Sequence, residues 1–381
     1  MSMRFGIRRP GRLAGAGVLA AAAAGTALVA APSAGAATVH VVAPGQSIQR
    51  AVDASRPGDI VQILPGTYQE NVLVTVPRLT IRGSGVRNVT LEPAPKVTAQ
   101  ASPKTGTATA ATTDATTATS CFTAGTGICV AGTAGHRVQG VHITGLTVTG
   151  FATYGIAATE TDGLRVTGVS SHDNGMYGIG AQKSVRSLFA GNRAANNAEA
   201  GIFLANTTQE EGGALDQQGA QVVGNELTGN KMGVVLRRVR DMNVEDNAAT
   251  GNCAGMFVIG DENTPRGGDL TVRQNVVSAN TKYCAANTRL PFVQGAGIVL
   301  TGVENTVVER NTVTGNSGTS VMSGGVVLFH SFVNVPNTGN TIRDNTLSGN
   351  APADLADRDT AGKDNTFTGN SCSTSQPAGR C

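Results

Sequence analysis

Asn311-Thr-Val-Thr-Gly-Asn316 is one copy of a six-residue pattern that recurs through the second half of the chain. Every copy begins and ends with Asn, carries Thr or Ser at its fourth position, and has Gly or Ala at its fifth. A short alternating apolar run precedes most copies, and Gly with a second apolar run follows most of them, so each unit is predicted to be strand, turn, strand. The other copies begin at Asn225, Asn247, Asn275, Asn345 and Asn365.

The same register continues toward the N-terminus at constant spacing, with units that begin at Leu146, Val169 and Asn192, 23 residues apart. Such units are too short to hold a crossover helix between parallel strands. The chain must therefore wind in coils, with each strand pairing to its equivalent one turn away. This predicts an all-β parallel β-helix whose repeated Asn residues form a structural ladder in the turns. One interior column should hold Val222, Val244, Val272 and Val308.

The composition agrees with a repetitive β protein. Of the 381 residues, 40% are hydrophobic, 4% aromatic and 14% charged, and there are 50 Gly and no Trp. These values exclude a disordered tail and a helical bundle. They favour a core of small β-branched residues joined by tight turns.

Residues 1–36 have the features of an export signal. Four Arg precede or border an apolar run from Leu13 to Ala31, and the small residues Ala34-Gly35-Ala36 follow it. A membrane anchor is the alternative, but a run so rich in Ala and Gly inserts weakly. The Arg8-Arg9 pair resembles a twin-arginine signal, although Pro10-Gly11 stands where that signal has apolar residues. We expect the leader to be removed and the protein to be secreted.

Removal of the leader changes the charge. It takes away four Arg and no acid, which leaves 25 basic and 26 acidic residues and a net charge of −1. A nearly neutral chain has no general basic character with which to bind nucleic acid or anionic lipid. We expect no nucleic-acid partner, no membrane association after cleavage, and a monomer.

The six Cys indicate disulfides. An even number in an exported chain, without a C-x-x-C spacing, argues against a metal site. Two pairs are predicted because their Cys residues are close in sequence. The third pair is Cys253 with Cys284, which follow the equivalent residues Asn252 and Asn280 of adjacent coils. The predicted pairs are Cys121 with Cys129, Cys253 with Cys284, and Cys372 with Cys381.

The mature chain is predicted to have three parts. Residues 37–91 form an N-terminal cap and the first coils, and they include a short capping helix within Gln46–Ser55 with Ser47 as its N-cap. Residues 92–120 are rich in Ala and Thr and carry too little apolar surface to pack, so we expect a flexible loop. Residues 121–381 form the remaining coils, and a disulfide closes their C-terminal end.

The first coils resemble a known superfamily. Pro44-Gly45-Gln46-Ser47-Ile48-Gln49, Pro57-Gly58-Asp59 and Leu64-Pro65-Gly66-Thr67-Tyr68 are similar to the opening of secreted right-handed parallel β-helix proteins of the pectin-lyase-like superfamily. The resemblance covers nearly the whole mature chain and implies a right-handed, single-stranded β-helix. The superfamily includes polysaccharide lyases, glycoside hydrolases, uronate epimerases, phage tailspikes and noncatalytic members, so the fold selects no single function.

One coil departs from the repeat. It has His172-Asp173-Asn174 where other coils have Thr-Gly-Asn, and equivalent tyrosines lie 23 residues apart on adjacent coils. Removing a proton beside a sugar carboxylate needs a base and a group that stabilises the developing charge. The predicted catalytic cluster is His172, Asp173, Tyr154, Tyr177, Lys183 and Arg186. The alternative is a solvated turn, with both tyrosines turned inward by strict alternation.

The outward positions of the Gly-started strand form an apolar stripe with one main charge, Arg237. This stripe is predicted either to lie under loops or to bind something less charged than an anionic polymer. Insertions on both sides of the strand would wall a groove. The predicted substrate-binding residues are Arg237, Gln182, Phe203 and Phe257.

These features predict a β-helix that engages polysaccharide in a lateral groove, as a lyase or C5-epimerase of uronic-acid polymers. A noncatalytic carbohydrate-binding or cell-surface structural protein is the alternative. A hydrolase would need two carboxylates at a set separation, and no paired-Asp motif is present among the acidic residues of the insertions, Asp216, Asp261, Glu262 and Asp269.

No cofactor is predicted. Calcium is the alternative, because carboxylate oxygens are the ligands it prefers. The spacing of the candidate ligands does not match the EF-hand loop, and such turns are usually solvated. Those candidates are Asp357, Asp359 and Asp364.

Overall fold

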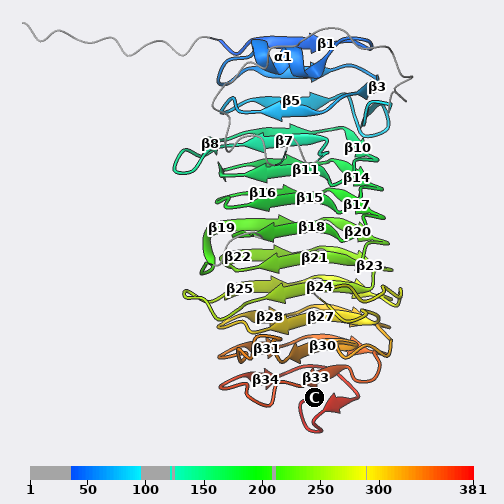
Figure 1. The fold of residues 1–381 in the computed structure, drawn as a ribbon. Coiled ribbons are helices and arrows are strands. Elements are labelled where there is room, and N and C mark those ends of the chain that lie inside the picture. The colour runs from blue at the N-terminus through cyan, green and yellow to red at the C-terminus, as the bar shows by residue number, and fades with distance from the viewer. Residues whose placement is uncertain (1–35, 96–120, 122–124, 208–211, 289) are drawn as a thin grey trace, which may run out of the picture. The chain divides into compact units, whose positions relative to one another are not determined.

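The computed structural model describes residues 36–95, 121, 125–207, 212–288 and 290–381. All but the last residue of the predicted leader, and most of the predicted 92–120 loop, lie outside these ranges. In the compact unit from Ala37 to Cys381, the described strands pair in parallel. Figure 1 shows how its coils stack, with a strand of each sheet recurring in successive coils.

Three long parallel sheets form the sides of the coils. In the described part of the chain, the first sheet contains β1 (Val39–Val42), β2 (Ile60–Ile63), β5 (Thr80–Gly83), β9 (His142–Thr144), β13 (Arg165–Thr167), β16 (Leu188–Ala190), β19 (Leu215–Val223), β22 (Val239–Glu245), β25 (Gly268–Arg273), β28 (Val307–Glu309), β31 (Thr341–Arg343) and β34 (Thr366–Thr368).

The second sheet contains β3 (Gly66–Gln69), β6 (Val89–Glu92), β10 (Thr147–Thr149), β14 (Ser170–His172), β17 (Arg193–Ala195), β20 (Glu226–Thr228), β23 (Ala248–Thr250), β26 (Val276–Ser278), β29 (Thr312–Thr314) and β32 (Thr346–Ser348).

The third sheet contains β4 (Val72–Val74), β7 (Ile128–Ala131), β11 (Tyr154–Thr159), β15 (Tyr177–Gln182), β18 (Ala200–Ala205), β21 (Met232–Arg237), β24 (Ala254–Ile259), β27 (Ala296–Thr301), β30 (Gly324–Phe329), β33 (Leu355–Asp357) and β35 (Ser375–Gln376). A small parallel pair is made by β8 (Val138–Gln139) and β12 (Thr161–Asp162).

The predicted interior column is confirmed. Val222 pairs with Val244, Val244 with Val272, and Val272 with Val308, and all four side chains are at most 1% exposed. The parallel register repeats because each residue of the pattern lies over the equivalent residue of the preceding coil. Apolar burial along this column, and along the inward positions of the other two sheets, stabilises the coils.

Buried Asn side chains form two long ladders at the turns. Both Asn residues of the repeat take part, so the pattern that predicted one ladder produces two. Within each, the side-chain amide of one Asn donates to the side-chain oxygen of the Asn one coil further, at 2.8–3.2 Å. Each internal amide also donates to a backbone carbonyl, so the buried turn is satisfied. The ladders run through Asn192, Asn225, Asn247, Asn275, Asn311, Asn345 and Asn370, and through Asn174, Asn197, Asn230, Asn252, Asn280, Asn316 and Asn350.

A single short helix, α1 (Ile48–Ala54), precedes β2 in the described residues. It begins after Ser47, whose hydroxyl accepts a hydrogen bond from the backbone N–H of Arg50 at 3.1 Å. The carboxylate of Glu70 accepts the backbone N–H groups of Ile48 and Gln49, which a helix N-terminus leaves without internal partners. Ile48 is buried, so the helix packs its apolar side against the first coils. No helix in the described residues has the length and apolar character to span a membrane.

The three predicted disulfides are present. The pair across adjacent coils, separated by 31 residues, confirms the register deduced from the repeat. The pairs are Cys121–Cys129, Cys253–Cys284 and Cys372–Cys381.

Candidate functional site

The apolar stripe on the third sheet is covered. We call its five outward residues the covered stripe, and their side chains are 0–5% exposed. They pack against Val293 and Met322, which come from the segments between the strands. The first of the two predicted alternatives, a stripe under loops, is therefore observed. The covered stripe consists of Phe203, Val235, Phe257, Val299 and Val327.

The predicted substrate-binding residues do not form one open surface. Phe203 and Phe257 are 3% and 2% exposed, which leaves almost no side-chain surface for a ligand. Arg237 ends β21 and Gln182 ends β15, and both are half-buried. We leave the two Phe residues out of the site developed below.

The six residues predicted as one catalytic cluster lie in three places. His172 and Asp173 are at the end of β14 on the second sheet, and the two tyrosines begin β11 and β15 on the third. Lys183 follows the last residue of β15. An extended strand rises about 3.3 Å per residue, so Lys183 lies roughly 20 Å along the chain from Tyr177. Arg186 is further still, where it pairs with Asp162.

The two tyrosine rings pack against each other on the outer face. The ring centroids of Tyr154 and Tyr177 are 4.9 Å apart, and Tyr177 stacks on Phe203 at 4.4 Å. The inward orientation expected from strict alternation is wrong. A Cβ added at Gly155 would meet buried polar atoms, and Ile156 also lies in the core, so the alternation changes phase between these two residues.

The ring of Tyr154 has room to pack because the residue beneath it, Gly180, has no side chain. Tyr154 lies over Gly180, where an added Cβ would approach the ring to 2.5 Å. Its hydroxyl accepts a hydrogen bond from Nε2 of Gln182 at 3.3 Å. Burial raises the pKa of Tyr154, with a further contribution from Tyr177. A phenol with a raised pKa is a poor base at neutral pH, so this pair is better suited to packing than to proton abstraction.

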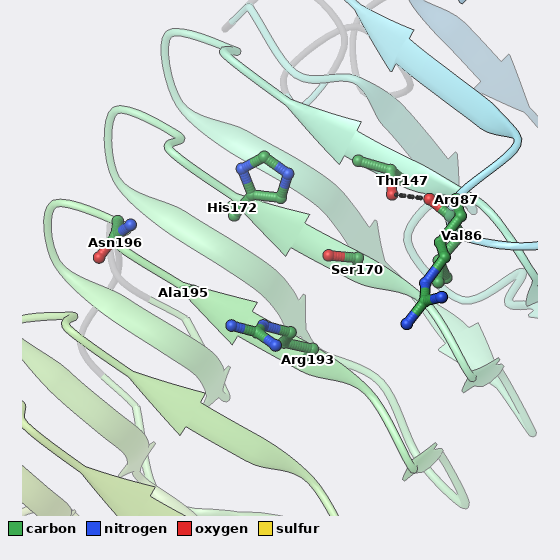
Figure 2. A pocket seen from close by; sticks show the side chains of 8 residues that line it. All are labelled: Val86, Arg87, Thr147, Ser170, His172, Arg193, Ala195 and Asn196. Carbon is green, nitrogen blue, oxygen red and sulfur yellow. Dashed lines mark hydrogen bonds between the residues drawn. The ribbon is translucent and has the colours of Figure 1, made fainter. Parts of the chain in front are cut away.

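An open hollow of about 430 Å³ lies on the second sheet beside His172 (Figure 2). The parallel register aligns Thr147, Ser170 and Arg193 in one outward column, and it places His172 next to Ala195 in the neighbouring column. Small side chains at Ser170 and Ala195 leave space between larger neighbours. We call this the His172 hollow, lined by Val86, Arg87, Thr147, Ser170, His172, Arg193, Ala195 and Asn196.

His172 is held by its neighbours through one ring nitrogen. Nδ1 lies 2.6 Å from a carboxylate oxygen of Asp173 and 3.2 Å from the hydroxyl of Thr149. The carboxylate favours a proton on Nδ1, which leaves the lone pair on Nε2. In the described residues Nε2 has no hydrogen-bond partner, and the side chain is 33% exposed. This nitrogen is available to accept a proton from a ligand.

Two guanidinium groups give the His172 hollow positive charge. Arg193 is 61% exposed and lies 3.8 Å from Glu226, a loose surface contact. Arg87 is also exposed, and no carboxylate of the described residues lies within ion-pair distance of it. Thr147 donates to the carbonyl of Val86 at 2.6 Å and ties the segment that carries Arg87 to the sheet. Guanidinium groups bind carboxylates through paired hydrogen bonds.

Three of the four acidic residues considered for hydrolysis are engaged elsewhere. Asp261 pairs with the buried Arg238, and Asp269 pairs with Arg240. Asp216 accepts the backbone N–H of Gln218. These contacts hold the carboxylates to the protein instead of aligning two of them across a cleft.

Two of the three carboxylates considered for calcium also have protein partners. Asp357 pairs with Arg380 at 3.1 Å, and Asp359 accepts two hydrogen bonds from Asn337. Asp364 lies in a turn with a left-handed backbone. Across the described ranges, no group of three or more His, Cys, Asp or Glu side chains is arranged to hold a metal ion.

Comparison with known proteins identifies the family. A model of the right handed beta helix region matches residues 105–277 and 210–335, which together exceed half of the chain. This chain belongs to the right-handed β-helix family. The handedness implied by the resemblance at residues 44–68 is thereby confirmed. A search of curated proteins with this sequence finds no match.

Solved structures show the same fold. The chain is similar to the A-module of the Azotobacter vinelandii mannuronan C-5 epimerase AlgE4, at 15% identity and a TM-score of 0.56 over 86% of this chain and 91% of that one. It is similar to an alginate lyase from Paenibacillus sp. str. FPU-7, at 16% identity and 0.51 over 89% and 99%. It is also similar to the Dettilon tailspike protein, at 13% identity and 0.51 over 87% and 66%. At these identities the likeness shows the fold alone.

Proposed function

We propose that this β-helix binds a uronic-acid polysaccharide across the His172 hollow and cleaves it by β-elimination. The observation that carries the proposal is the His172–Asp173 pair, which leaves Nε2 open beside Arg87 and Arg193. The arginines supply the cations that an acidic sugar needs, and the histidine supplies a base. Among the similar structures, an epimerase and a lyase are named for alginate polymers, which are built from such sugars.

The reaction follows from these roles. Arg193 or Arg87 binds the sugar carboxylate and reduces its negative charge, which makes the proton on the adjacent C5 more acidic. Nε2 of His172 accepts that proton, and Asp173 stabilises the imidazolium that forms. The electron pair of the C5–H bond becomes the C4=C5 double bond while the C4–O bond breaks. The leaving oxygen takes the bond's electron pair and a proton, from the imidazolium or from water.

Elimination suits the His172 hollow better than epimerisation does. An epimerase must remove the proton from one face of C5 and return a proton to the other, so it needs two acid–base groups. Of the side chains that line the hollow, His172 is the one with a nitrogen lone pair that can accept the proton. The two tyrosines lie on the third sheet, where Tyr154 contacts Tyr177 and Tyr177 stacks on Phe203 of the covered stripe.

Binding without cleavage is the second candidate. It is favoured by the openness of the hollow, because Arg193 is mostly exposed and water reaches the base. Electrostatic stabilisation of a developing charge is strongest where water is excluded. An open cationic surface of this kind is sufficient to hold a polymer.

The test separates the two candidates. The protein without its leader is incubated with polygalacturonate, alginate and a glycosaminoglycan, and the ultraviolet absorbance of the unsaturated product is followed beside a binding assay. His172→Ala should abolish product with an unchanged melting temperature, and Arg193→Gln should weaken binding. His136→Ala is the matched control, since His136 is exposed and lies outside the hollow.

Each outcome decides something. Product formation that His172→Ala abolishes and His136→Ala retains supports elimination at this site. Binding without product by the unmodified protein supports the noncatalytic candidate. Product that persists in His172→Ala, or binding that Arg193→Gln leaves unchanged, rules out the His172 hollow as the site.

A further inference from the structure

A second hollow lies on a different sheet, near the C-terminal coils. It has a volume of about 420 Å³ and lies beside β30 and β33 of the third sheet, well down the stack from β14 in Figure 1. We call it the Arg358 hollow. The residues that line it are Ser320, Val321, Phe329, His330, Pro352, Arg358 and Gln376.

Arg358 has only neutral partners. Its Nη1 donates to the carbonyl of Val321 at 2.9 Å, and its Nε and Nη2 donate to the side-chain oxygen of Gln376 at 3.3 and 3.0 Å. No carboxylate of the described residues lies within ion-pair distance of it. The side chain is half-buried, and this burial lowers the pKa of Arg358. A cation removed from water without a counter-ion carries a cost that an anionic ligand would offset.

The guanidinium keeps unused hydrogen-bond donors. It has five N–H groups, and three of them are used by Val321 and Gln376. One N–H therefore remains on each terminal nitrogen. N–H groups on the two terminal nitrogens of a guanidinium can bind the two oxygens of one carboxylate, which is among the strongest Arg contacts. Because Val321 and Gln376 hold the other donors, the guanidinium is oriented before a ligand arrives.

Exposed apolar side chains lie on the segments that line this hollow. Phe332, Val321 and Val333 are 52%, 51% and 49% exposed. The ring of Phe332 is 5.4 Å from that of Phe329 and 6.1 Å from that of His330, and both of those residues line the hollow. A binding site that combines an aromatic surface with a few fixed polar groups suits a ligand with one apolar face. A sugar ring presents its C–H bonds in this way.

We propose that the Arg358 hollow is a second saccharide-binding site, which takes a sugar residue that carries a carboxylate. Arg358 binds the carboxylate through its two remaining N–H groups, Phe332 packs against the ring, and His330 and Gln376 are placed to contact hydroxyls. The site shares no residue with the His172 hollow, so it stands whether or not the chain cleaves a polymer.

Calorimetric titration with trigalacturonate tests this site in the Arg193→Gln background, which weakens the His172 hollow. Arg358→Met should reduce the remaining affinity at least about tenfold, the loss expected for a charge-assisted pair. Phe332→Ala should reduce it several-fold. The matched control is Arg82→Met, because Arg82 is an exposed Arg that also binds a neutral glutamine, Gln62, and lies in neither hollow.

Two further ligands define the chemistry. A galactose trimer, which lacks the carboxylate, should bind at least about tenfold more weakly, and acetate, which lacks the ring, should not compete at equal concentration. Equal affinity for Arg358→Met and its parent, or for the neutral and acidic trimers, overturns the proposal. If Arg358→Met unfolds, Phe332→Ala and the two trimers decide, because Phe332 is an exposed residue whose removal leaves the core intact.

Failure of this site is distinguishable from failure of the proposed function. Loss of product in His172→Ala with no effect of Arg358→Met removes only the second site. An effect of Arg358→Met on trimer binding without any product from the unmodified protein removes only the elimination.

Discussion

The outer faces of the second and third sheets differ although the same coils build both. In one coil, Val276 on β26 of the second sheet is 46% exposed, while Val299 on β27 of the third is 0% exposed. Both are outward residues in extended strands, so neither sheet geometry nor residue type explains the difference. Cys284 and Val293 pair with each other and pack over the third sheet, and no described segment covers the second sheet in this way at this coil. An apolar stripe in a β-helix sequence therefore does not by itself mark a binding groove.

An Asp placed at each of these two valine positions should lower the free energy of unfolding by very different amounts. Val299→Asp buries a carboxylate without a partner, so the free energy of unfolding should fall by about 4 kcal/mol or more. Val276→Asp places the same carboxylate in water and should change it by about 1 kcal/mol or less. Chemical denaturation of both variants measures the difference. Equal losses would show that the third sheet is not covered in solution.

Removal of the disulfide that tethers the cover should have a smaller effect. Cys253→Ser with Cys284→Ser opens a loop of 31 residues in the unfolded chain and should lower the free energy of unfolding by about 2–4 kcal/mol. Hydrogen exchange should also become faster in β24 and β27, which lie under the tethered segment. The double variant at Cys372 and Cys381 is the control, because that pair lies near the C-terminus. Unchanged exchange in β24 and β27 would mean that packing alone holds the cover.

The smallest expected effect is on the first sheet, where protonation of His142 should make the stability depend on pH. His142 on its outer face is partly buried, and this burial, with the nearby charge of Arg165, lowers the pKa of His142. The unfolded chain then binds a proton more readily than the folded one, so stability is full above the ordinary pKa of about 6.5 and declines as the pH falls below it. His142→Gln, which retains a side chain able to bond Thr167, should flatten that decline. Melting temperatures between pH 8 and 5 measure it, and an identical slope in both proteins would contradict the assignment.

The interior packing was predictable from the sequence because the same residue pattern recurs in successive coils. Every coil must place its apolar residue over the last, so the spacing of the Asn pattern was enough to derive the Val222 column and the Cys253–Cys284 pair. The ladders followed from the same spacing. None of these inferences required knowledge of the loops.

The site was harder to predict, for reasons that are local. Lys183 is near Tyr177 in sequence, but an extended strand converts those six residues into a large separation. The phase change at Gly155 reversed the expected direction of the tyrosines. Arg193 could have been found, because it lies 23 residues after Ser170 and in the same column. No periodicity marks Arg87, which reaches the hollow from a turn.

The second Asn ladder ends on a residue of a different kind. Its last amide, on Asn350, donates to the carboxylate of Asp354, which also accepts hydrogen bonds from Ser373 and Thr374. A carboxylate accepts from the amide before it but has no N–H to pass to another coil. The row of amides is therefore terminated chemically at Asp354. This residue precedes Leu355, which pairs with Val326, so it stands at the register position of Gly325, where an added Cβ would meet a ladder Asn. An engineered protein with extra coils would need Gly at position 354 and Asn in the next coil before the ladder could grow.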